Sequence, residues 1–171
     1  MITPDYARTH ASYNAEMNRR LYAAAAGLAD AGRRQDRGAF WRSIHGTLSH
    51  LLWADQMWMH RFDGWDRPAV PIAQSGELMA DFDAMTAARF TADARLEAWA
   101  TTLDPAWLAG SETWFSGAIQ QQVTRPRPLL VMHMFNHQTH HRGQAHAMLT
   151  AAGQGTGATD LWVLAGECRS D

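Results

Sequence analysis

Cysteine is nearly absent from this chain, because Cys168 is the only one among its 171 residues. A disulfide within the chain is therefore impossible, which is typical of proteins kept in a reducing compartment, and we expect a cytoplasmic protein. Cys168 lies three residues before the C-terminal Asp171. We expect a surface or tail position for it and no catalytic role for its thiol.

Long apolar runs and one-sided charge are also missing. The longest uncharged apolar runs are too short to cross a bilayer, and the first residues lack the charged segment and apolar core of a secretory signal. The chain has 15 Lys+Arg and 17 Asp+Glu, a net charge of -2. Its basic residues form no stripe of the kind that a phosphate backbone selects. We therefore predict neither a membrane nor a nucleic acid as partner.

Bulky apolar residues are abundant instead. Hydrophobic residues make up 46% of the chain and charged residues 19%, which is ordinary for a globular protein, and the length suits one domain with its own core. Eight tryptophans and nine methionines provide material for this core and for the walls of a pocket.

Apolar side chains recur at helical spacing in four segments. We predict four long helices with the approximate bounds Pro4–Gly32, Asp36–Phe62, Ser75–Leu103 and Pro126–Gly153. Thr3 is the expected N-cap of the first helix, Phe40 is placed on the apolar face of the second, and Gly64 is expected to end the second. In residues 111–124 the apolar side chains no longer recur at helical spacing, and we predict a short β-hairpin or extended excursion there.

Four long amphipathic helices in a chain of this length indicate an all-α fold, a four-helix bundle. We predict that residues 1–153 form this bundle and that residues 154–171 form a C-terminal extension, packed on the bundle or trailing from it. The extension contains one short apolar element around Leu161, Trp162 and Leu164.

The fourth predicted helix carries a row of histidines. His133, His137 and His141 are spaced i, i+4 and i+8, which puts all three imidazoles on one side of a helix. The same side carries Met134 and Met148, so the imidazoles point into an apolar face. Neutral imidazole is the commonest protein ligand of divalent transition metals, and burying it is costly unless its nitrogens are satisfied.

A metal with an open coordination position usually has three protein ligands, so a neighbouring helix must supply one more. The second predicted helix offers His45, His50 and His60. At about 100° per residue, His50 falls on the flank of small residues, near Thr47 and Ala54, where an imidazole has room. His45 and His60 fall away from this flank.

The three ligands chosen on this geometry are His50, His137 and His141. His133 is kept as the alternative ligand. Spacing alone does not decide between the pair His133 and His137 and the pair His137 and His141. The alternative is that the histidines are hydrogen-bonded core residues without a metal. Three imidazoles suit nickel and zinc, and iron and copper are compatible with them.

Two segments resemble the DNA-damage-inducible DinB family. These are Leu48–Leu51 followed by Ala54-Asp55, and Asn136–Gln144, which contains the string HxxxHRGQ. The resemblance implies a four-helix bundle of up-down-down-up topology with a divalent metal, often nickel or zinc. It assigns the ligands to His50, His137 and His141. It also implies a homodimer and a role in stress response.

The resemblance also suggests a reaction class. Relatives include metal-dependent transferases and isomerases that use low-molecular-weight thiols, so we expect a thiol S-transferase or a metal-dependent hydrolase that acts on a small molecule. The alternative is a non-enzymatic metal-binding stress protein in which the metal is structural. A closed shell of four protein ligands, with His133 as the fourth, would favour that alternative.

Several neighbours of the predicted ligands have two interpretations each. Gln144 either holds a ligand nitrogen or makes a structural hydrogen bond, and Arg142 is expected to form a salt bridge or a helix cap. Asp55 is either a general base or, as we expect, a buried structural carboxylate. Three tryptophans either wall a pocket or fill the core: Trp53, Trp58 and Trp114.

Overall fold

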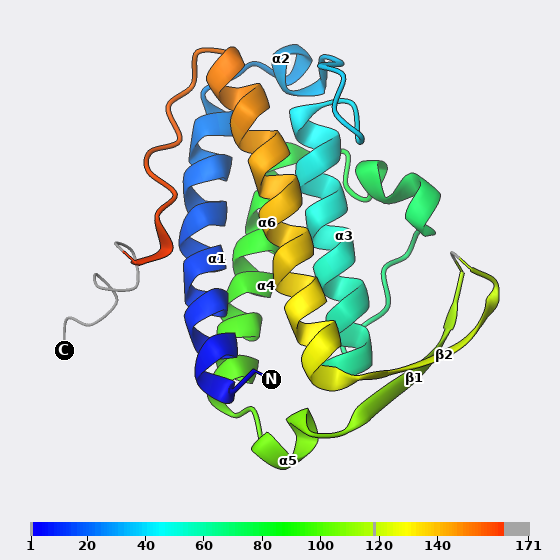
Figure 1. Ribbon diagram of the computed structural model, residues 1–171. Coiled ribbons are helices and arrows are strands. Elements are labelled where there is room, and N and C mark those ends of the chain that lie inside the picture. Colours follow the sequence, from blue (N-terminus) through cyan, green and yellow to red (C-terminus); the bar gives the residue numbers. More distant parts are fainter. Residues whose placement is uncertain (1, 118, 163–171) are drawn as a thin grey trace.

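Four long helices lie side by side and enclose the apolar core (Figure 1). The computed structural model describes residues 2–117 and 119–162. The long helices are α1 (Pro4–Ala26), α3 (Ile44–Asp63), α4 (Phe82–Thr101) and α6 (Arg127–Ala151). Shorter elements connect them: α2 (Asp30–Arg34), the 3-10 helix η1 (Ile72–Glu77), α5 (Pro105–Leu108), and the strands β1 (Ser111–Ser116) and β2 (Gln121–Pro126). The protein is mostly helical with one small antiparallel sheet.

The start of α1 is as predicted, but its end is earlier. The Thr3 side chain accepts a hydrogen bond from the backbone of Tyr6, and a proline follows it at the first helical position. The helix ends at Ala26 and not near Gly32, because the backbone becomes extended at Ala29 before the separate helix α2 begins. The Arg33 guanidinium then donates to carbonyl groups at the end of α1, which supplies partners for groups that a helix end leaves free.

The second predicted helix begins later than expected, at Ile44 and not at Asp36. Gly38 and Arg42 have φ values of 75° and 65°, in the left-handed region where a helix cannot continue. Ser43 then caps α3 by accepting a hydrogen bond from the backbone of Gly46 at 3.0 Å. Phe40 is 75% exposed, so its placement on the apolar face was wrong.

The end of α3 is as predicted. Gly64 has a φ of 65°, and its backbone N–H donates to the carbonyl of Met59, which is a common helix ending that glycine adopts without strain.

The third predicted helix is divided into two elements, η1 and α4. Asp81 interrupts it, because its carboxylate accepts a hydrogen bond from the backbone of Ala84 at 2.7 Å and starts a new helix there. The predicted hairpin is confirmed as β1 and β2, with Trp114 opposite Val123. The fourth predicted helix is confirmed as α6.

Each of the four long helices packs against two others. α1 contacts α4 and α6, and α3 contacts the same two helices. Fully buried apolar side chains fill the space between them, among them Leu48, Met85, Leu96 and Met134. Each such side chain contributes roughly 1.5–3 kcal/mol through the hydrophobic effect. In the described part of the chain, no helix combines the length and the apolar character needed to cross a membrane.

Residues 154–162 run back along α1 after α6 ends (Figure 1). Tyr13 donates a hydrogen bond to the carbonyl of Thr159 at 2.7 Å, and Arg20 donates to the carbonyl of Ala158 at 3.1 Å. The division of the chain at Gly153 stays a prediction. Leu164, Cys168 and the rest of the predicted extension after residue 162 lie outside the described residues.

Candidate metal centre

The three predicted ligands meet between α3 and α6. One ligand atom from each of His50, His137 and His141 lies within 4.8 Å of the other two. Nε2 of His50 is 3.2 Å from Nε2 of His137, and the ring centroid of His141 is 4.7 Å from that of His50 and 4.5 Å from that of His137. The group exists because His137 and His141 are one helical turn apart and α3 packs directly on α6.

The donor set fits a divalent transition metal. Two nitrogen ligands about 2.0–2.1 Å from a tetrahedral ion are roughly 3.3 Å apart, close to the 3.2 Å between Nε2 of His50 and Nε2 of His137. All three donors are imidazoles, which suit zinc, nickel, iron and copper. That these residues bind a metal stays a prediction, and the geometry supports it.

Hydrogen bonds orient two of the three rings. Nδ1 of His141 donates to Oε1 of Gln144 at 2.7 Å, so the hydrogen bond expected of Gln144 is confirmed. Nδ1 of His50 is hydrogen-bonded to Oγ of Ser75 at 2.8 Å. A partner on Nδ1 fixes the ring and leaves Nε2 to face the other imidazoles, as in many protein metal sites.

Sequence reasoning missed two residues that support His50. Ser75 is fully buried on η1, and the Trp41 ring stacks on the His50 ring at 4.2 Å between centroids. Gly76 leaves room for the Trp41 ring beside α3. A side chain at position 76 would place its Cβ 3.3 Å from the Trp41 ring and 3.5 Å from the carbonyl oxygen of Gly46. Ser75 and Trp41 come from connecting segments whose path depends on tertiary packing, so no local sequence pattern indicates their role.

Burial keeps these imidazoles neutral. The pKa of His50 is lowered to about 3 and that of His137 to about 4, mainly because burial disfavours the charged form and also because neighbouring imidazoles repel a proton. Burial lowers the pKa of His141 as well. At neutral pH the three nitrogens therefore offer lone pairs to a cation without competition from protons.

The remaining histidines of α3 have backbone partners. Nε2 of His45 is 2.9 Å from the carbonyl oxygen of Met79, and Nδ1 of His60 is 2.7 Å from that of Trp65. They lie outside the three-histidine group, as the helical geometry predicted. His133 is also outside this group, and its ring packs on Trp58 at 5.3 Å between centroids.

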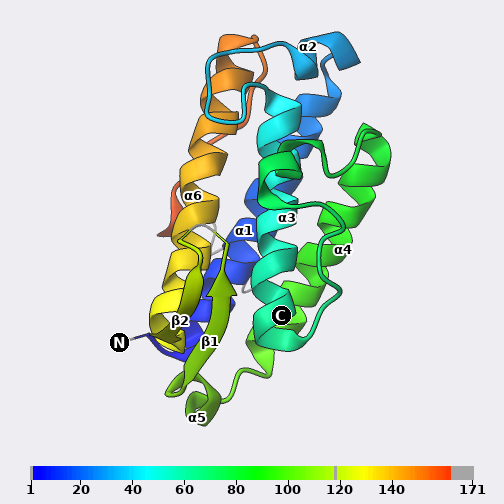
Figure 2. The same cartoon turned by 90° about the vertical axis from the view of Figure 1, so that its right-hand side faces the viewer.

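A cavity of about 660 Å³ opens beside His50 and His137. We call it the aromatic cavity, because its lining includes Trp53, Val70, Phe115 and the other two tryptophans that were candidates for a pocket wall, Trp58 and Trp114. In Figure 2 the hairpin and the segment between α3 and α4, which both contribute lining residues, lie on the same side of the molecule, in front of α3 and α6.

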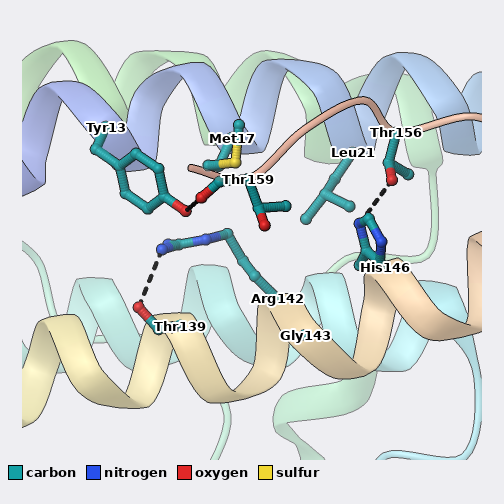
Figure 3. Close-up of a pocket in the computed structure, with 9 residues that line it drawn as sticks. All are labelled: Tyr13, Met17, Leu21, Thr139, Arg142, Gly143, His146, Thr156 and Thr159. Atoms are coloured by element: carbon teal, nitrogen blue, oxygen red, sulfur yellow. Dashed lines mark hydrogen bonds between the residues drawn. The ribbon is translucent and has the colours of Figure 1, made fainter. Parts of the chain in front are cut away.

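Arg142 lies on another side of α6, where it lines a second cavity of about 290 Å³ (Figure 3). Its Nη2 donates to Oγ1 of Thr139 at 3.3 Å, and its guanidinium carbon is 5.5 Å from the centroid of the Tyr13 ring. Among the described residues, no carboxylate lies within ion-pair distance of it, and its hydrogen bond goes to the Thr139 side chain and not to a helix end. Both expected alternatives, a salt bridge and a helix cap, were therefore wrong.

The Asp55 carboxylate is buried and structural, as expected. It accepts hydrogen bonds from Arg89 at 2.6 Å and from the side-chain amide of Gln138. Arg89 also contacts Asp93 at 2.8 Å, and Asn18 donates to Asp93 at 2.9 Å. Both oxygens of Asp55 are therefore occupied, and it is unavailable as a general base.

The sequence profile of the DinB family matches residues 1–167, nearly the whole chain. This chain belongs to the DinB family. No curated protein and no solved structure matches it. Family membership thus agrees with the resemblance found in the two histidine segments, and the three histidines of this DinB protein lie where those segments meet.

Proposed function

We propose that this DinB protein is a metal-dependent enzyme of the thiol S-transferase or hydrolase type, with His50, His137 and His141 as ligands of nickel, zinc or iron. The four long helices support the up-down-down-up four-helix bundle implied by the family. A small-molecule substrate, with a low-molecular-weight thiol as cosubstrate in the transferase case, would enter the aromatic cavity. A homodimer is part of the same proposal.

One observation carries the proposal: the three-histidine group borders an open cavity. Among the described residues, the group contains no fourth histidine, cysteine or carboxylate. Catalytic sites of this kind keep one position open for water or substrate, whereas structural sites are closed by protein ligands. The cavity beside His50 and His137 is large enough for a small molecule.

The residues around the group have separable tasks. Gln144 and Ser75 hold the rings of His141 and His50, and the tryptophans of the aromatic cavity limit the access of water. When bound, a divalent metal lowers the pKa of a coordinated water or thiol toward neutrality. Because no described residue that lines the cavity is acidic, the chain itself supplies no carboxylate base there.

The test has two stages. Elemental analysis of the purified protein identifies the metal, and a panel of thiols with electrophiles, and of hydrolysable esters and amides, is then assayed with the metal, after chelation, and after metal restoration. We expect turnover that chelation abolishes and metal restores. Equal turnover with and without metal, or metal-loaded protein without any turnover across the panel, would contradict the proposal.

A structural metal remains the second candidate, for a specific reason. His50 comes from α3, while His137 and His141 come from α6, so a bound cation would cross-link two long helices. This role predicts a stability gain from the metal with no exchangeable coordination position.

A further inference from the structure

We propose that the aromatic cavity binds an extended small molecule that carries a carboxylate at the end remote from the histidines, and that Arg61 recognises this carboxylate with help from Arg67. The inference rests on the proposed function, because it concerns the same cavity and names the class of its ligand.

The charge of the cavity lining is one-sided. Arg61 and Arg67 both line it, and none of its described lining residues is acidic. Glu112 interacts electrostatically with Arg61, but its carboxylate contacts Nε and Nη2 of Arg127 at 3.3 Å. Among the described residues, no carboxylate lies within ion-pair distance of Arg61. The Arg61 guanidinium is therefore a cation without an anionic partner within the described chain, and it could pair with an anion from outside.

The Arg61 guanidinium is held in place by aromatic rings. Its central carbon lies 4.5 Å from the Trp58 centroid and 5.3 Å from the Trp114 centroid. Stacking on a ring face leaves the N–H groups at the edge of the guanidinium plane free, and this edge matches the two oxygens of a carboxylate. Burial and the charge of Arg67 lower the pKa of Arg61 to about 10. A bound anion would offset the repulsion between the two guanidinium groups.

The distance between the two ends of the cavity sets the length of the ligand. Arg61 follows His50 by eleven positions on α3, which is about 16 Å along the axis. Helical side chains tilt toward the N-terminus, so both side chains lean the same way. Because the Arg61 side chain is the longer of the two, its guanidinium lies on the order of 10–15 Å from the His50 imidazole. Met57 and Trp58 line the stretch between. The matching ligand has an apolar body between its reactive group and its carboxylate.

Binding to the cobalt-loaded full chain tests the inference without an activity assay. The thiolate-to-cobalt absorption band reports the affinity of 6-mercaptohexanoate and of its neutral counterpart 6-mercaptohexanol. We expect the acid to bind about tenfold more tightly, the usual size of a charge-assisted hydrogen bond. Shorter 3-mercaptopropionate should show little preference over mercaptoethanol, because it cannot reach Arg61.

Matched variants assign the preference to Arg61. Arg61→Ala should bind the acid and the alcohol equally, and Arg61→Lys should retain part of the preference. Arg95→Ala is the control, because Arg95 stacks on Trp65 at 4.0 Å outside the cavity lining. It should behave as the unmodified protein. An Arg61→Ala protein that still prefers the acid would overturn the inference.

A second measurement needs no metal. Calorimetry of the metal-free chain with octanoate and with 1-octanol should show a preference for octanoate that Arg61→Ala loses. If neither thiol produces an absorption band but this preference holds, the inference stands and the thiol part of the proposed function fails. Equal affinity for octanoate and octanol, together with equal affinity for the two thiols, would refute the inference.

Discussion

Two polar clusters interrupt the apolar core beside α3 and α6, and they differ in what completes their contacts. The first, which we call the ionic cluster, consists of Asp55, Arg89, Asp93, Gln138 and Asn18. Its Arg89 and Asp55 side chains are each 1% exposed. Both carboxylates of this cluster have partners within the chain. Asp55 is paired with Arg89 and Gln138, and Asp93 is paired with Arg89 and Asn18.

The second cluster, formed by His50, His137 and His141, has contacts to Ser75 and Gln144 and one contact between its own rings, from Nε2 of His50 to Nε2 of His137 at 3.2 Å. Its imidazole nitrogens point toward one another, and like lone pairs at this separation repel unless a proton or a cation lies between them. The cluster also borders the aromatic cavity, while neither Asp55 nor Arg89 is among the residues that line that cavity. Burial of polar groups thus stabilises the fold in the ionic cluster, whereas the three imidazoles beside the aromatic cavity have the arrangement that the proposed metal site requires.

Removing the cation of the ionic cluster should have the largest effect on stability. Arg89→Met leaves Asp55 and Asp93 buried without a counter-charge, and loss of one partner of a buried pair costs about 3–5 kcal/mol. Urea unfolding of the metal-free protein measures this loss. Arg95→Met, on the exposed side of the same helix, removes only the stacking of Arg95 on Trp65 and should cost no more than about 1 kcal/mol. A loss below about 1 kcal/mol for Arg89→Met would mean that the ionic cluster is not structural.

Removing a member of the histidine cluster should instead abolish metal binding. His141→Ala deletes one of three ligands, so elemental analysis should find the metal content reduced from near stoichiometric to near zero in a folded, helical protein. His133→Ala is the matched control, because His133 lies on the same helix outside the group, and it should retain the metal. Full occupancy in His141→Ala, or loss in His133→Ala, would require a different ligand set.

Outer contacts of the histidine cluster should have an intermediate effect. Gln144→Ala removes the acceptor of the His141 Nδ1 hydrogen bond, and Ser75→Ala removes the partner of His50. Loss of such contacts lowers metal affinity by about 10–100-fold, which competition with a chromophoric chelator measures. Metal affinity equal to that of the unmodified protein in both variants would show that the rings are positioned by packing alone.

The histidine cluster should also affect the pH dependence of stability. In the metal-free protein the pKa values of His50 and His137 are about 3 and about 4, below the value of about 6.5 in an unfolded chain. The unfolded state thus takes up protons that the folded state does not. Stability should be complete above about pH 6.5 and fall as the pH drops toward 4.

The double variant His50→Gln and His137→Gln tests this origin of the pH dependence. Its free energy of unfolding, measured with urea at several pH values after chelation, should fall less steeply with acid than that of the unmodified protein. Parallel curves for the two proteins would assign the dependence to other groups.

Local patterns in the sequence predicted much of the site. The spacing of His137 and His141 depends only on helix geometry, and the small residues beside His50 marked the side of α3 that faces α6. The start of α3 was not predictable from apolar periodicity, because the left-handed backbone at Arg42 overrides the apolar Phe40. Periodicity records which side chains suit a helix but not where the backbone stops permitting one.

The contacts around the ligands depend on segments that are far apart in the sequence. Ser75 and Trp41 reach His50 because η1 and the loop before α3 approach each other closely, and no pattern within either segment specifies that approach. The environment of Arg142 depends likewise on α1. Local sequence could not reveal the contacts of Arg142 with Thr139 and Tyr13.

X-ray absorption spectroscopy of the metal-loaded protein tests the central claim most directly, because it counts the ligands of the ion. Three imidazoles and at least one exchangeable light atom, which sulfur replaces when a thiol is added, are the predicted result. Four protein ligands that do not change on addition of thiol, or a shell without imidazoles, would contradict it.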